Sequence, residues 1–196
     1  MQNTIVDIRR VQAQSITEPV DRPDVKAWAI IDHNDDDDLI DKLITEVRTA
    51  IENKTKMSLV KRVITIVVQL EGQFKLPYGP VRSIDTVVLN HGAVAETLTQ
   101  DDYSTIGLDN PIFRPKKCGI YQITYTAGYG VEGQYNVSVP EDLKNGIKQE
   151  IAYRYEHRGD ETNTKSSAGN ETVNSIDGIS AGAMKYIKPY IGMAWL

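Results

Sequence analysis

The sequence predicts an α+β protein, namely a small helical bundle with an inserted antiparallel β-sheet and a C-terminal helix on a flexible loop. Three observations predict this class. Apolar residues recur at spacings of three and four near both ends of the chain, as on one face of a helix. In the middle they alternate with polar residues, as in strands with one face in water. A long stretch near the C-terminus is almost free of large apolar residues.

Length and charge limit the functions to be considered. A chain of 196 residues buries about 70 % of its unfolded surface, so we expect one compact core, 19–158, after an N-terminal extension, 1–18. The 22 basic and 27 acidic residues give a net charge of −5, which argues against broad contact with phosphate backbones. The single cysteine, Cys118, cannot form an intrachain disulfide, and we expect an inert thiol. The N-terminus lacks the apolar run of a signal peptide or membrane span, so we expect a soluble protein made in a cytoplasm.

Two helices are predicted in the first third of the chain. After a strand-like start at Thr4–Ile8, Pro23 is placed to open a short helix over 23–31. Its buried side is predicted to consist of Val20, Ala27, Trp28 and Ile31. A second helix, 36–55, is indicated by residues at helical spacing: Leu39, Ile40, Leu43, Ile44, Val47 and Ile51.

The hydrophobic period then changes to two and predicts a β insertion over 60–127. The first long strand has Ile64, Ile66, Val68 and Leu70 on one face. A second strand lies in "VRSIDTVVLN", and shorter ones are expected at Tyr103–Ile106 and Ile112–Arg114. The last, "YQITYTA", places Tyr121, Ile123, Tyr125 and Ala127 on one side. Short connections without crossover helices imply antiparallel pairing.

A third helix is predicted over 140–158, with Pro140 at its start and an apolar stripe of Leu143, Ile147, Ile151 and Tyr155. Residues 159–182 are expected to form a mobile polar loop, because they cannot offset their ordering entropy by burial. The last segment, 183–196, contains the end of a short helix, about Ala181–Tyr190. One interpretation is a helix that closes the protein's own core. The other is a docking segment for another subunit or protein, since it ends in large apolar groups. Its candidate interface residues are Met184, Tyr186, Ile187, Tyr190, Ile191 and Trp195.

The acidic stretch "IDHNDDDDLI" raises the question of a metal site. A calcium loop starting at Asp32 would place Asp37 where glycine is needed and Leu43 where a bidentate glutamate is needed. We therefore expect no metal. The simpler interpretation is that one carboxylate caps the second helix and the others occupy its first turn, each stabilising it by about 0.3–1 kcal/mol. The candidate cap residues are Asp35, Asp36, Asp37 and Asp38.

Other motifs give no catalytic or cofactor site. The glycines of "TAGYGVEG" do not open a helix, which a phosphate-binding loop requires, so they are interpreted as turn residues. The histidines His33, His91 and His157 lack metal-ligand spacing. The short basic run "RPKK" could contact DNA or an acidic partner through Arg114, Lys116 and Lys117.

Four stretches, taken in order, resemble the head-tail connector (adaptor) family of tailed bacteriophages. They are "IDHNDDDDLIDKLITEVRTAIE", "LPYGPVRSIDTV", "YQITYTAGYG" followed by "VPEDLKNGIKQEIAYRYEHR", and "GAMKYIKPYI". The resemblance implies a virion neck protein without enzymatic activity, assembled in the host cytoplasm. It implies a homo-oligomeric ring of about 12 copies below the portal protein. This ring would extend the DNA channel without binding the genome specifically, and would receive the next neck or tail component.

Two other functions are compatible with the same residues. One is a different neck protein, such as a tail-completion or stopper protein. The other is a small metal-dependent enzyme built on the aspartate run, for which the ligand spacing is unfavourable.

Overall fold

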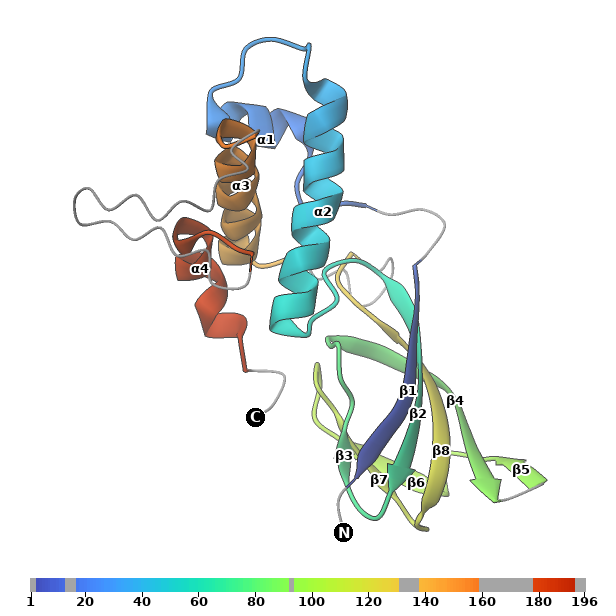
Figure 1. Ribbon diagram of the computed structural model, residues 1–196. Coiled ribbons are helices and arrows are strands. Elements are labelled where there is room, and N and C mark those ends of the chain that lie inside the picture. The colour runs from blue at the N-terminus through green and yellow to red at the C-terminus, as the bar shows by residue number, and fades with distance from the viewer. Residues whose placement is uncertain (1–2, 13–16, 92–93, 131–137, 159–177, 193–196) are drawn as a thin grey trace. The chain divides into compact units, whose positions relative to one another are not determined.

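The computed structural model describes residues 3–12, 17–91, 94–130, 138–158 and 178–192. The chain divides into two compact units. The helical unit consists of residues 18–55 and 139–193, and the sheet unit consists of residues 1–17, 56–138 and 194–196. Residues 56–138, the largest part of the sheet unit, are therefore inserted between the second and third helices (Figure 1).

Four α-helices and one 3-10 helix form the described part of the helical unit. They are α1 (Arg22–Ala29), α2 (Asp37–Thr55), α3 (Glu141–Glu156), α4 (Ala181–Ile187) and η1 (Lys188–Tyr190). All predicted helices are present, within about two residues of their expected ends. The side chain of Asp21 caps α1 by accepting a hydrogen bond of 2.9 Å from the backbone N–H of Asp24.

The apolar stripes of α2 and α3 lie in the core of the helical unit, as their spacing predicted. The buried residues include Ile40, Leu43, Ile44, Val47, Ile51, Leu143, Ile147 and Ile151. The predicted buried face of α1 is correct for Val20 and wrong for Ala27 and Trp28. Val20 and Val25 are buried, but Ala27 is exposed and the Trp28 side chain is 38 % exposed.

A buried ion-pair network crosses this core. Arg48 and Glu52, one turn apart on α2, are each 1 % exposed. The Arg48 guanidinium lies 3.1 Å from Glu52 and donates from Nε to Glu18 at 2.6 Å. Breaking a buried pair of this kind costs about 3–5 kcal/mol, because one charge stays behind in the interior. The network therefore fixes residue 18, where the chain enters the helical unit, against α2.

Two antiparallel sheets form the sheet unit. Its strands are β1 (Thr4–Gln12), β2 (Arg62–Leu70), β3 (Phe74–Lys75), β4 (Val81–His91), β5 (Val94–Thr97), β6 (Tyr103–Ile106), β7 (Ile112–Pro115) and β8 (Gly119–Ala127). The larger sheet has the order β1-β2-β8-β4-β5 and the smaller has the order β3-β7-β6 (Figure 1). Residues 4–12, from the segment expected to be an extension, pair with β2 as an outer strand.

The core of the sheet unit contains the faces that the alternating pattern predicted. The two long central strands, β2 and β8, contribute Ile64, Ile66, Val68, Leu70, Tyr121, Ile123, Tyr125 and Ala127, all at most 1 % exposed. Phe113 of β7 joins them from the smaller sheet. Strands β3 and β5, with two and four residues, are not among the strands predicted from the sequence.

Gly128, which ends β8, gives a testable prediction. Its φ is +116°, and a Cβ built there would lie 2.2 Å from the carbonyl oxygen of Val60. We expect Gly128→Ala to lower the free energy of unfolding by about 1–3 kcal/mol, as measured by urea denaturation. Gly72→Ala is the control, since a Cβ there meets nothing within 4 Å. Equal effects of the two substitutions would contradict this account of the turn.

Candidate functional site

The C-terminal helix α4 presents two different sides. Ala183 and Ile187 are fully buried, and a Cβ built on Gly146 of α3 would lie 3.0 Å from Cγ1 of Ile187. The absence of a side chain at Gly146 thus allows α4 to approach α3 closely. Ile187, one of the predicted interface residues, is therefore part of the protein's own core.

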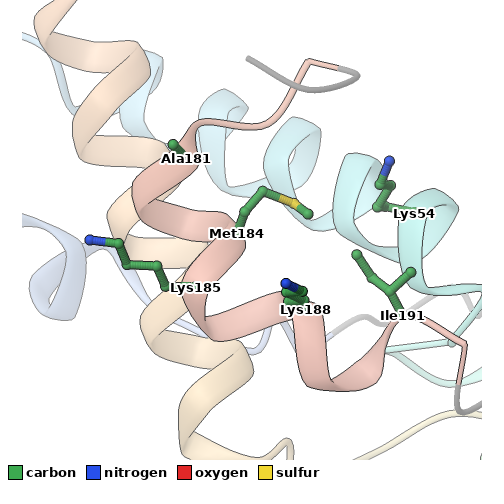
Figure 2. Close-up of a pocket in the computed structure, with 6 residues that line it drawn as sticks. All are labelled: Lys54, Ala181, Met184, Lys185, Lys188 and Ile191. Carbon is green, nitrogen blue, oxygen red and sulfur yellow. The ribbon is translucent and has the colours of Figure 1, made fainter. Parts of the chain in front are cut away.

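The other side of α4 faces an open groove of about 590 Å³ next to the C-terminal end of α2. Figure 2 shows the Met184 side chain extending from α4 toward the part of α2 that carries Lys54. The residues that line this α4 groove are Lys54, Ala181, Met184, Lys185, Lys188 and Ile191. Three apolar side chains thus form the groove together with three lysines. This is a surface suited to an apolar group that carries negative charge beside it.

The remaining predicted interface residues have intermediate exposure or lie outside the described residues. Tyr186 and Tyr190 are partly buried, and burial raises the pKa of the Tyr190 hydroxyl. Trp195 falls in the range 193–196, which the structure does not describe. The same holds for most of the predicted polar loop, of which 159–177 lie outside the described residues.

A hydrogen-bond network that the sequence analysis did not find holds the start of α4. Glu150 of α3 is 1 % exposed, and its carboxylate accepts from the backbone N–H of Ser180 at 2.8 Å. Arg154 donates to the other oxygen of Glu150 at 2.9 Å and to the carbonyl of Gly178 at 2.9 Å. Ser180 in turn caps α4 through the backbone N–H of Ala183. The chain therefore enters α4 at a fixed point on α3.

The aspartate run forms tertiary bonds as well as the first turn of α2. Asp37 and Asp38 lie in that first turn, as expected. The Asp36 carboxylate accepts a hydrogen bond of 2.5 Å from the Tyr155 hydroxyl and lies 3.2 Å from Arg158. Asp36 thus connects α3 to the start of α2.

Asp37 connects α2 to α1 instead. It pairs with Arg22 at 2.8 Å and with Lys26 at 2.9 Å. Asp35 and Asp38 are exposed. These bonds to other helices have no local signal in the sequence of the run, whose pattern points only to capping or metal binding.

No group of three histidine, cysteine or acidic side chains within the described residues could hold a metal ion. His33 Nε2 lies 3.4 Å from the Tyr155 hydroxyl, and the His157 ring stacks on the Tyr153 ring with their centroids 4.2 Å apart.

Gly128 and Gly130 have positive φ and follow β8 in the chain. Cys118 is exposed. Among the helices that the structure describes, none is long and apolar enough to cross a membrane.

The basic residues of "RPKK" belong to the sheet unit. Arg114 lies on β7, and Lys116 and Lys117 follow it in the turn to β8. All three are exposed. Lys117 lies 4.0 Å from Glu96 of β5.

The Asp36–Tyr155 hydrogen bond predicts a pH dependence. The bond, with the charge of Arg158, lowers the pKa of Asp36 below its ordinary value. Because the folded pKa is the lower one, the stabilisation is complete above the unfolded pKa of about 3.9 and is lost as the pH falls through the folded value. At pH 7, Tyr155→Phe should be less stable than the wild type, and this difference should shrink below about pH 4. Urea denaturation from pH 7 to pH 2.5 measures it. A difference that stays constant across this range would exclude the ionised bond as its cause.

Several solved structures share the fold. A chain in the neck of an empty gene transfer agent (GTA) particle, computed with C6 symmetry, aligns with a TM-score of 0.62 at 15% identity, over 93% of this chain and 94% of that chain. A chain in the virion of a native GTA particle aligns with a TM-score of 0.59 at 18% identity, over 89% and 94%. A chain in the neck of a native GTA particle, computed with C12 symmetry, gives a TM-score of 0.54 at 18% identity, over 90% and 94%.

No curated protein matches the sequence significantly. The sequence profile described as "Phage gp6-like head-tail connector protein" matches residues 23–110 and 116–190. This match includes α2, α3 and α4 of the helical unit, and β2 to β6 and β8 of the sheet unit. Since it covers most of the chain, the protein belongs to the phage gp6-like head-tail connector family.

Proposed function

We propose that this connector protein forms a closed ring of about 12 copies in the virion neck, between the portal protein and the next neck or tail component. The observation that supports this most strongly is the family match over 23–110 and 116–190. The fold supports it too, because chains of GTA necks computed with C6 and C12 symmetry share it over nine-tenths of this chain.

The composition suits a channel through which DNA moves. A net charge of −5 limits attraction between the ring and the phosphate backbone. In this proposal the genome passes without specific binding, and Arg114, Lys116 and Lys117 supply at most a local contact to DNA or to an acidic partner. The ring is a structural part of the particle and has neither enzymatic activity nor a cofactor.

The C-terminal segment, 183–196, is proposed to attach the chain to the portal or to a neighbouring subunit. Met184 and Ile191 support this role, because they line an open groove although they are apolar. Tyr186, Tyr190 and Trp195 belong to residue types that dominate interface energetics. Ile187 contributes indirectly by holding α4 on α3.

Mass measurement of the chain mixed with a portal ring from the same source tests the proposal. We expect a complex that contains the portal and a closed ring of about 12 copies of this chain. Binding of single copies, or a plug of a few copies at the channel end, would favour a tail-completion or stopper protein instead.

A truncated chain that lacks residues 190–196 tests the C-terminal segment in the same measurement. We expect it to keep its helix and sheet signals and to lose attachment to the portal ring. If the truncated chain unfolds, the segment belongs to the protein's own core. If it folds and still joins the complex, the proposed docking role is wrong.

A further inference from the structure

Ile30, the residue that ends α1, combines an unfavourable backbone conformation with an exposed side chain. It adopts the left-handed conformation, with φ 55° and ψ 48°, and its side chain is 91 % exposed. This conformation is unfavourable for a β-branched residue, and helices that end this way usually have glycine there. An exposed side chain gives no packing energy in return.

Exposed aromatic and acidic residues lie close to Ile30 in the sequence, at the end of α1 and in the connection to α2. Trp28 is 38 % exposed, and Asp32, Asp35 and Asp38 are exposed as well. None of these three carboxylates takes part in an ion pair within the described parts of the chain. We name this surface the acidic corner; it consists of Trp28, Ile30, Asp32, Asp35 and Asp38. It presents an apolar projection beside negative charge.

The α4 groove is complementary to the acidic corner in its apolar surface and in its charge. Its floor is apolar, with Ala181, Met184 and Ile191, and its volume of about 590 Å³ has room for a branched side chain. Lys54, Lys185 and Lys188 add positive charge around it. Electrostatic complementarity of this kind selects partners and fixes their register.

The two surfaces cannot meet within one molecule. In Figure 1 the connection from α1 lies at one end of α2 and the segment that follows α4 lies near the other end. The length of α2 separates Asp37 from Lys54 by roughly 25 Å, at 1.5 Å per residue. A ring of identical subunits needs two different surfaces that fit each other, because each copy contacts the next head to tail.

We propose that the acidic corner of one subunit docks into the α4 groove of the next subunit in the ring. The side chain of Ile30 enters the groove beside Met184 and Ile191. The carboxylates of the corner face Lys185 and Lys188. This inference rests on the proposed function, since it assigns the subunit interface of the ring.

Ile30→Gly separates this role from folding. Glycine relieves the unfavourable backbone conformation, so the monomer should unfold at a higher urea concentration than the wild type. The same variant should form the ring at least about tenfold less readily, as measured by the concentration at which the ring appears in the presence of the portal. A variant that is more stable and assembles as well as the wild type would overturn the proposal.

Charge reversal with rescue identifies the partner surface. Lys185→Glu with Lys188→Glu, and separately Asp35→Lys with Asp38→Lys, should each weaken ring formation at least about tenfold, because like charges then face each other. A chain that carries all four substitutions should recover assembly. Lys42→Glu, on an exposed position of α2, is the matched control and should assemble normally.

The outcomes distinguish this inference from the proposed function. If the wild type forms no ring with the portal, the proposed function is wrong and the interface is wrong with it. If the wild-type ring forms and neither reversal weakens it, the interface lies elsewhere and the proposed function stands. If only the groove reversal weakens assembly and the fourfold variant does not recover, the groove binds the portal or the chain's own terminal residues, and the proposal is overturned.

Discussion

The buried carboxylate of Glu150 is the constraint on which the C-terminal part of the helical unit depends. It lies on α3, is 1 % exposed, and accepts from the backbone of Ser180 and from Arg154. A buried charge is stable only when its oxygens are satisfied, so the residues at the start of α4 must stay in place. One turn earlier, Gly146 lets Ile187 pack closely on α3. Together these contacts hold α4 against α3, and the α4 groove exists because of them.

The same principle applies in the rest of the helical unit. Arg48 and Glu52 are buried together with Glu18 beside them, while Asp36 and Asp37 join α2 to α3 and α1. Paired charges therefore connect α2 to α1 and to the end of α3. They specify how the helices pack, whereas apolar stripes alone would allow several arrangements. Asp32, Asp35 and Asp38 of the acidic corner have no ion pair within the described residues, so their carboxylates are the ones available to another molecule.

The sequence predicted elements well where one periodicity persisted over many residues. The stripe of α2 and the alternating faces of β2 and β8 could be identified because burial on one side requires that spacing. The antiparallel arrangement followed from the short connections. Strands β3 and β5 are too short to show a period, and α1, with eight residues, did not reveal whether Val25 or Trp28 faces the core.

The candidate site could be predicted only in part. The apolar spacing of Met184, Ile187 and Ile191 marked α4, but it could not separate the residue that packs on α3 from those that line the groove. Glu150 and Arg48 carried a weak signal, because each is a charged residue at a position on an apolar stripe, three or four residues from a buried isoleucine. Their partners lie on other segments, and no local pattern specifies such pairs. The strained conformation of Ile30 likewise depends on how α1 ends.

Hydrogen exchange of Glu150→Ala tests the central claim, that this carboxylate holds α4 in place and thereby forms the assembly surface. The account predicts that amides of residues 183–187 lose protection at least about tenfold, since a bond to a buried charged group stabilises by more than 1.4 kcal/mol. Amides of residues 44–51 in α2 should keep theirs. Glu141→Ala, at an exposed position of the same helix, should change neither. Unchanged protection of α4 in Glu150→Ala would contradict the account.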